Sequence, residues 1–436
     1  MAAASSIGTT IEFYDFFIFG TAAALVFPTI FFAQSDPNTA VLQSFATFAV
    51  AFFARPVGAI VFGHYGDRIG RKRTLVWTLL IMGIATVGIG LLPGYSTGAF
   101  GFASDGIGIW APTLLVAARF FQGFAVGGEW AGATLLTAEY APAGKRGMMA
   151  MWPQLGPAFA FFLSSLTFLI FTQGDRTDAG SFFMTIGWRI PFLLSSLLVI
   201  VGLWIRLAVD ETPVFKQAER NLGQDPERKL PFLDAIRYQW KEILIAGGAL
   251  ASLFSLFYMG TSFLTSYATK HLGYSMPFVL TMGILAAIFF GLCIAASAMW
   301  SDKIGRRKVI MISCVLAVVW SLLLFPMLDS GITGLYVLGL MGTLCIFGVA
   351  YGPAGAALPE MFKARYRYTG AGLGYNLAGV LGGAIPPLIA ARFVAAGDSM
   401  SVGIMLAVLS SISVICTYLM VESKDYKMDA GVTTQD

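Results

Sequence analysis

The sequence predicts an all-α membrane protein in which twelve transmembrane helices form two pseudo-symmetric six-helix bundles. Of its 436 residues, 57% are hydrophobic and only 12% are charged, whereas soluble domains carry about 25% charged residues. Apolar runs recur from end to end, and each is long enough to cross about 30 Å of hydrocarbon as a helix. A charged motif that occurs once in each half of the chain indicates that the two bundles are related.

Hydropathy places the helices and divides the chain. The long polar break at 210–240 is predicted to be a cytoplasmic linker between an N-terminal six-helix bundle, 1–209, and a C-terminal six-helix bundle, 241–423, with a cytoplasmic tail at 424–436. Frequent Pro and Gly residues inside the apolar runs are tolerated when neighbouring helices cover the backbone. The predicted helices are 3–32, 40–63, 73–92, 112–138, 147–172, 186–208, 241–269, 276–300, 307–327, 333–358, 368–392 and 399–421.

The Lys and Arg residues predict the orientation, because connections rich in these residues stay in the cytoplasm. Most of the 28 lie in the connections after the even-numbered helices and in the tail. The opposite side holds only Arg176, Arg189, Lys270 and Arg392. We therefore expect a multi-pass protein of the plasma (cytoplasmic) membrane with both termini in the cytoplasm.

An internal repeat links the two halves. The segment 66–73 (GDRIGRKR) follows the second predicted helix, and 301–308 (SDKIGRRK) follows the eighth. Two parallel halves of this kind are typical of secondary transporters. A second pair of motifs, a glutamate seven residues before an arginine, follows the fourth and tenth helices: Glu139 and Arg146, then Glu360 and Arg367.

These repeated charges suggest a cytoplasmic gate. We expect Asp67 to face the positive end of the eleventh helix and Arg71 to pair with Glu139. Exposed pairs of this kind contribute about 0 to 1 kcal/mol each, which suits a gate that must open. The alternative is that the charges only set the topology. The complete predicted gate is Asp67, Arg71, Glu139, Arg146, Asp302, Arg306, Glu360 and Arg367, with Arg306 paired to Glu360 by symmetry.

The segment 63–73 (GHYGDRIGRKR) resembles the signature loop of the major facilitator superfamily. Within that superfamily, further segments are similar to the metabolite:proton symporter family. The resemblance spans nearly the whole chain and implies the twelve-helix major facilitator fold. Members of the family carry shikimate, citrate, 2-oxoglutarate, or betaines and proline. The resemblance therefore implies coupling to protons, but it does not identify one substrate. The similar segments are 8–16 (GTTIEFYDF), 119–123 (RFFQG), 127–129 (GGE), 366–370 (YRYTG) and 375–376 (YN).

Five ionisable residues stand out inside the predicted helices, away from the helix ends: Glu12, Asp15, Arg55, Arg119 and Glu129. Each costs at least about 2.5 kcal/mol near the bilayer centre and is therefore a functional hypothesis. Helix rise allows Asp15 and Arg119 to meet at one level, and protonation of the aspartate would open such a pair. A pair of this kind also resembles the acid and arginine of other proton-linked members. The alternative is a fixed structural pair.

We predict Asp15, Arg119, Glu12 and Glu129 as proton-coupling residues. For Glu12 two interpretations stay open, a second proton site or a structural bridge. The same two apply to Glu129, which could pair with Arg55 in the cytoplasmic third of the membrane.

Substrate contacts are expected from helix faces that line a central cavity. Arg119 and Gln122 lie on one face of the fourth helix, because they are three residues apart. A second arginine in the membrane favours an anionic substrate. The predicted substrate-binding residues are Arg119, Gln122, Arg55, Tyr14, Tyr258, Tyr375 and Asn376.

The sequence therefore predicts proton-coupled symport of a small hydrophilic metabolite, most readily an organic acid, by alternating access. One alternative is a proton-linked drug or solute antiporter of the same fold, although the segment 156–160 (GPAFA) holds only part of the glycine-proline element of that class. Another is a symporter of a zwitterionic solute such as a betaine.

An enzyme is not expected, because the sequence holds no P-loop, metal-ligand cluster or nucleophile motif. The four cysteines lie in apolar segments without metal-ligand spacing. We expect neither a metal nor another cofactor. The expected partners are a small-molecule substrate, protons and the lipid bilayer, with no nucleic acid, and the chain is expected to act as a monomer.

Overall fold

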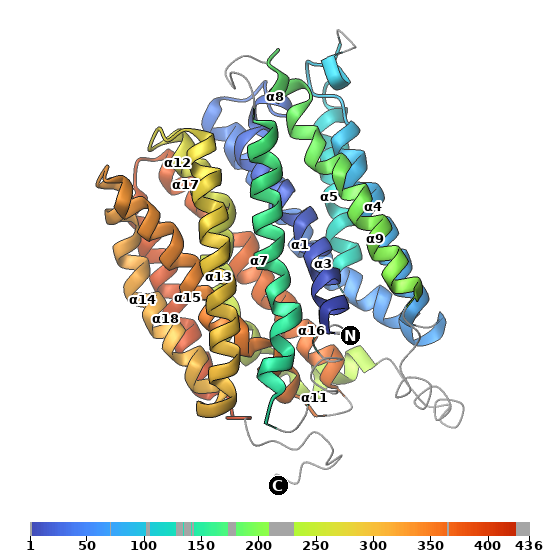
Figure 1. Ribbon diagram of the computed structural model, residues 1–436, viewed down its shortest axis with the longest axis vertical. Coiled ribbons are helices and arrows are strands. Elements are labelled where there is room, and N and C mark those ends of the chain that lie inside the picture. Colours follow the sequence, from blue (N-terminus) through green and yellow to red (C-terminus); the bar gives the residue numbers. More distant parts are fainter. Residues whose placement is uncertain are drawn as a thin grey trace.

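A computed structural model describes residues 2–69, 71–101, 105–127, 134, 141, 144–172, 180–208, 231–363 and 366–423. The described residues form a bundle of long helices joined by short connections (Figure 1). In Figure 1, α1 and α11 begin toward the lower end of the bundle, and α8, α12 and α17 lie toward the upper end.

The described part of the N-terminal half supplies six long helices and four short ones. Residues 209–230, which include most of the predicted linker, lie outside the described part of the chain. The elements of this half are α1 (Ala2–Leu25), α2 (Phe27–Ile30), α3 (Pro37–Ile69), α4 (Arg71–Leu91), η1 (Ala99–Gly101), α5 (Trp110–Val126), α7 (Arg146–Phe171), α8 (Phe182–Thr185), η2 (Gly187–Arg189) and α9 (Ile190–Ala208).

The C-terminal half repeats this arrangement, but two of its helices contain π-helical turns, a feature frequent at functional sites. The turns η3 and η4 interrupt the helices that begin as α11 and α16. The elements are α11 (Pro231–Tyr258), η3 (Met259–Phe263), α12 (Leu264–Lys270), α13 (Met276–Ile304), α14 (Arg306–Asp329), α15 (Thr333–Glu360), α16 (Arg367–Ala378), η4 (Gly379–Ala384), α17 (Ile385–Ala395) and α18 (Ser399–Leu419).

Among the described residues, 10 helices are long and apolar enough to cross a membrane. Two further helices, α1 and α5, bring the total to the predicted twelve. The described part of α5 has 17 residues, which is just short of a full span, and α1 has 24 residues but carries Glu12 and Asp15.

Residues 231–240, which we placed in the linker, form the first turns of α11. This segment buries Ala235 and Gln239, which lie on one helical face, and exposes Ile236. A backbone break at Gln239, with φ −129° and ψ 28°, separates it from the apolar part of the helix. Its charged residues lower the average hydropathy, so a short amphipathic helix is easily mistaken for a linker.

The two halves meet along α7, which packs against α1 of its own half and against α13 and α15 of the other. On the other side of the bundle, α3 contacts α16, η4 and α17. Small residues allow these helices to approach closely. A Cβ atom at Gly156, for example, would lie 2.1 Å from the hydroxyl oxygen of Thr9 in α1.

Candidate functional site

Four buried side chains form a polar chain through the N-terminal half. The Thr86 hydroxyl of α4 donates to Asp15 Oδ2 of α1 at 2.7 Å. The Gln122 amide of α5 donates to the Thr86 oxygen at 2.7 Å, and Arg119 Nη1 donates to Gln122 Oε1 at 3.1 Å. The structure thus brings Asp15 and Arg119 into one network, linked through two neutral side chains instead of a direct ion pair.

Both ends of this chain keep unsatisfied atoms. Within the described part of the chain, Asp15 Oδ1 accepts no hydrogen bond, and Arg119 Nε and Nη2 donate none. Arg119 is fully buried, with 0% exposure, and Asp15 has 2%. Buried polar atoms without partners are rare and costly, so they call for an explanation. The Nε and Nη2 atoms form the edge of a guanidinium that binds a carboxylate with two hydrogen bonds.

Aromatic rings hold the two buried arginines in place. The guanidinium of Arg119 lies 4.2 Å from the ring centre of Phe16 and 4.0 Å from that of Phe19. The guanidinium of Arg55 lies 4.7 Å from the same Phe16 ring and 5.1 Å from Phe52. Such contacts are worth about 2 kcal/mol each when water is excluded. They keep both positive charges at the centre of the molecule.

A small cavity of about 10 Å³ lies between the halves beside Arg55. Its walls include Glu12 of α1 and Tyr375 and Asn376 of α16. Asn376 crosses the boundary and donates from Nδ2 to the carbonyl oxygen of Gly127 at 3.1 Å. A space of this size holds about one water molecule, so this cavity is too small for a metabolite.

The three predicted tyrosines lie in different surroundings. The Tyr258 ring packs edge-on against Phe52 with 4.8 Å between ring centres, so it belongs to the central cluster. The Tyr375 hydroxyl is 3.2 Å from that of Tyr351, within the C-terminal half. Tyr14 instead donates to the carbonyl oxygen of Pro191 at 3.3 Å, which directs its side chain into the N-terminal bundle.

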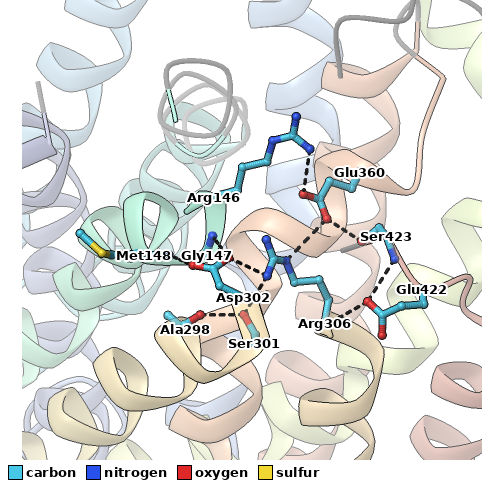
Figure 2. A network of polar contacts seen from close by, with 10 residues as sticks. All are labelled: Arg146, Gly147, Met148, Ala298, Ser301, Asp302, Arg306, Glu360, Glu422 and Ser423. Carbon is cyan, nitrogen blue, oxygen red and sulfur yellow. Dashed lines mark hydrogen bonds and ion pairs between the residues drawn. The ribbon is translucent and has the colours of Figure 1, made fainter. Parts of the chain in front are cut away.

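A second cluster closes the lower end of the interface (Figure 2). Asp302, near the end of α13, accepts hydrogen bonds from the backbone N–H groups of Gly147 and Met148, both at 2.9 Å. It thereby caps the positive end of α7, across the boundary between the halves. Position 147 requires glycine, because a Cβ there would lie 2.5 Å from the carbonyl oxygen of Ala298.

Ion pairs connect the capping residue Asp302 to further charged residues of both halves. Arg306 Nη1 lies 2.7 Å from Asp302 Oδ1, and Arg306 Nε lies 3.7 Å from Glu360 Oε2. Arg146 of the N-terminal half reaches Glu360 Oε1 at 3.6 Å, and Ser423 donates to Glu360 Oε2 at 2.5 Å. Glu360 is therefore shared by both halves and by the segment after α18 (Figure 2). We name Arg146, Asp302, Arg306, Glu360 and Ser423 the lower gate.

The structure pairs Arg306 with Glu360, as the internal symmetry suggested. Arg367 is buried at the start of α16. The remaining predicted gate and coupling residues cannot be placed, because Glu129, Glu139 and the side chains of Asp67 and Arg71 lie outside the described part of the chain.

Sequence reasoning missed Thr86, Glu422 and Ser423. A lone threonine in an apolar helix gives little signal, since its hydroxyl usually bonds within the helix. Thr86 Oγ1 also lies 2.9 Å from the Met82 carbonyl oxygen, so its single proton is shared between Met82 and Asp15. Glu422 accepts from the backbone N–H of Arg306 at 2.8 Å. Glu422 and Ser423 both follow the last apolar run, where only their polarity is visible in the sequence.

Comparisons with known proteins agree with this architecture. The family described as Sugar (and other) transporter matches residues 1–427. The inner membrane metabolite transport protein YhjE of Escherichia coli (strain K12) is 43% identical over 97% of this chain and 93% of its own length. The shikimate transporter of the same organism is 37% identical over 97% and 94%, and the proline/betaine transporter of Salmonella typhimurium is 32% identical over 96% and 83%.

Solved structures show the same fold. A crystal structure of a D-xylose-proton symporter superposes with a TM-score of 0.73 at 19% identity, covering 99% of this chain and 98% of that one. The inward open conformation of the xylose transporter XylE from E. coli also gives 0.73, at 19% identity over 98% and 97%. The predicted fold class and the predicted resemblance are confirmed, and the relatives are transporters, not enzymes.

Proposed function

We propose that this chain, which belongs to the sugar (and other) transporter family, couples the entry of a small organic acid to the entry of a proton. The transport of metabolites across a membrane follows from the family. Proton coupling, the anionic nature of the substrate and the residues that carry both are our proposal. We retain the predicted orientation, in which the lower gate faces the cytoplasm with the termini.

One observation carries the proposal. Asp15 Oδ1 and the Nε and Nη2 edge of Arg119 are buried and unpartnered at opposite ends of one hydrogen-bonded chain. An ionised Asp15 attracts Arg119 and competes with any other anion for it. A protonated Asp15 leaves Arg119 to bind the carboxylate of a substrate with two hydrogen bonds. Proton and anion therefore bind together, which is the requirement for symport.

Thr86 and Gln122 connect the protonation of Asp15 to the binding of substrate by Arg119. The Gln122 amide oxygen accepts a hydrogen bond from Arg119 Nη1. The Nε and Nη2 edge of the guanidinium is not bonded to Gln122. The amide nitrogen of the same side chain binds Thr86, which binds Asp15. A change in the protonation of Asp15 reorients the Thr86 hydroxyl and, through Gln122, the guanidinium.

The state of the gate supports alternating access. The lower gate is shut by contacts between the halves, and the cavity of about 10 Å³ beside Arg55 is too small for a metabolite. Transport then requires the two halves to rock apart, first on one side and then on the other. Near the gate, Gln154 donates to the carbonyl oxygen of Tyr351 at 2.8 Å, and this bond must also break.

A zwitterionic solute such as a betaine is the second candidate, because relatives include proline/betaine transporters and aromatic rings recognise quaternary ammonium groups. Arg55 and Arg119 already lie over Phe16, and Arg55 also lies over Phe52. Two fixed positive charges beside these rings disfavour the binding of a positively charged ammonium group. The geometry therefore favours an anion.

A proteoliposome assay tests the proposal. The purified protein is reconstituted with a pH-sensitive dye inside, and shikimate, 2-oxoglutarate, succinate or glycine betaine is added outside. Acidification of the interior with a carboxylate supports symport. Alkalinisation would instead identify an antiporter, and acidification by glycine betaine alone would transfer the assignment to the second candidate. Accumulation of substrate against its gradient that is unaffected by collapse of the proton gradient would contradict coupling.

A further inference from the structure

One face of α9 packs against α1 along the segment that carries the proposed proton site. The Tyr14 hydroxyl of α1 donates to the carbonyl oxygen of Pro191 at 3.3 Å. Further along α9, a Cβ atom at Gly202 would lie 3.0 Å from Cδ1 of Ile11. Ser195 comes one helical turn after Pro191 and two turns before Gly202, so these three residues share one face. The side chain of Ser195 therefore points toward α1, between the two contacts.

The Ser195 hydroxyl lies beside the carboxylate of Asp15. Ser195 is fully buried, with 0% exposure. Among the described residues, its Oγ makes no hydrogen bond, and neither does Asp15 Oδ1. A hydroxyl can donate to an ionised carboxylate and can accept from a protonated one. Because a buried polar atom without a partner is costly, a small rotation of the serine side chain that joins the two atoms is favourable.

Tyr14 keeps the Ser195 hydroxyl available for this contact. A serine inside a helix often donates to a carbonyl oxygen of the preceding turn, as the neighbouring Ser196 does to Leu193 at 2.6 Å. For Ser195, the carbonyl oxygen one turn earlier is that of Pro191, which accepts from the Tyr14 hydroxyl. The second lone pair of that oxygen serves the helix itself. The serine proton is therefore left for a partner on α1.

The two oxygens of the Asp15 carboxylate have different surroundings. Oδ2 accepts from the Thr86 hydroxyl of α4, which leaves Oδ1 for the hydroxyl from α9. Three ionisable groups lie near this carboxylate. Arg119 of α5 is at the other end of the polar chain, Tyr14 is directed to α9, and Glu12 lies one turn earlier in α1. The partner that the structure offers to Oδ1 is thus a neutral hydroxyl and not a charge.

We propose that Ser195 is a positioning residue that holds the transported proton on Oδ1 of Asp15. This inference rests on the proposed function, in which Asp15 takes up that proton. In the ionised state the serine donates to Oδ1. When a proton from solution binds, an O–H bond forms at Oδ1, and the serine turns to accept from it. Oδ2 then loses its charge and competes less well with the Met82 carbonyl oxygen for the proton of Thr86.

The pH dependence of uptake by proteoliposomes tests this role. Ser195→Ala removes a donor to the ionised carboxylate, and hydrogen bonds to a charged group are stronger than those to a neutral one. The variant should therefore bind the proton at a higher pH, and the midpoint of the pH dependence should rise by at least about half a unit. Ser195→Thr, which keeps the hydroxyl, should restore the wild-type midpoint.

Ser410→Ala is the matched control. Ser410 is also 0% exposed, and its hydroxyl also has no hydrogen bond within the described chain, but it lies in α18 of the other half. Its midpoint should equal that of the wild type. A midpoint of Ser195→Ala that does not move, or that moves no further than that of Ser410→Ala, would overturn the proposal.

Infrared spectroscopy follows the carboxyl group without any transport. The C=O band of protonated Asp15 is identified by its loss in Asp15→Asn, and its intensity is recorded against pH. Ser195→Ala should raise the midpoint of this band by the same amount. A midpoint that stays in place, or the lack of such a band, would overturn the proposal. A shifted band in a protein whose wild-type accumulation ignores the proton gradient would instead contradict the proposed function and leave the position of Ser195 beside the Asp15 proton standing.

Discussion

The carboxylate of Asp302 accepts a hydrogen bond from the backbone N–H of Gly147 at 2.9 Å, across the boundary between the two halves. A side chain of one half thus completes a helix end of the other, and the bond cannot survive when the halves separate there. The exposed helix end and the freed carboxylate return to water when the gate opens. The cap therefore adds a modest stabilisation to the closed state, as a reversible gate requires.

Asp302→Asn should open the lower gate more often. The amide loses the charge that favours the helix end and the ion pair to Arg306, and a loss of about 1 kcal/mol corresponds to a roughly fivefold shift between the two states. Gln154→Cys reports on opening, because position 154 is buried at the interface. Its labelling rate from the cytoplasmic side should rise about fivefold.

Lys308→Gln serves as the control for this experiment. It removes an exposed charge near the same gate that is not one of the lower-gate residues. A rise in the labelling rate that is as large as that of Asp302→Asn would show that the general charge of the loop, not the cap, holds the gate shut.

Arg119→Lys should impair substrate binding while the fold survives. Lysine keeps the charge but cannot present the two-pronged edge that a carboxylate needs. We expect KM for the organic acid to rise at least about tenfold. An unchanged KM would remove Arg119 from the binding site.

Arg189→Lys is the matched control, because Arg189 is equally buried but donates to backbone carbonyl oxygens, including that of Gly90 at 2.9 Å. This variant should lower the thermal stability and leave KM unchanged. The comparison separates the loss of a binding group from the loss of a packed arginine.

Asp398→Ala should reveal a pH-dependent helix cap. Hydrogen bonds from the Ser401 side chain and backbone N–H lower the pKa of Asp398, which caps α18. A carboxyl group with a lowered pKa stabilises the fold above its ordinary pKa of about 4, and this contribution is lost as the pH falls through the lowered value. The difference in Tm between the wild type and Asp398→Ala should be largest at neutral pH and shrink at pH 3. A constant difference down to pH 3 would contradict this role.

The sequence predicts the scaffold well because a membrane imposes long apolar helices that hydropathy detects directly. The repeat around Asp302 and Arg306 also predicted the partner of Glu360, since symmetry transfers a contact from one half to the other. Helix boundaries are harder to predict where charged residues lower the hydropathy of a segment that still buries one face. The amphipathic turns at 231–240 of α11 resemble a linker because their charged residues hide a buried face.

Only part of the candidate site can be predicted from the sequence. Buried charges such as Asp15 and Arg119 stand out in apolar helices, because their burial is costly. The sequence does not reveal that Thr86 and Gln122 lie between them, since the contact depends on the relative rotation of α1, α4 and α5. Tyr14 illustrates the same difficulty: a tyrosine one residue before Asp15 points to α9 because adjacent residues of a helix face different ways.

The central claim is that protonation of Asp15 decides whether Arg119 is available. Asp15→Asn imitates the protonated form permanently, so Arg119 should bind substrate but no proton can be released. In proteoliposomes, this variant should exchange internal for external substrate at a rate near that of the wild type. Asp398→Asn, which changes an exposed carboxylate at a helix cap, is the control for a lost charge.

The decisive measurement is the accumulation of substrate by Asp15→Asn under an imposed proton gradient, with exchange measured in the same vesicles. We predict that accumulation falls to the level of vesicles without a gradient while exchange persists. Accumulation equal to that of the wild type would contradict the role of Asp15 in coupling.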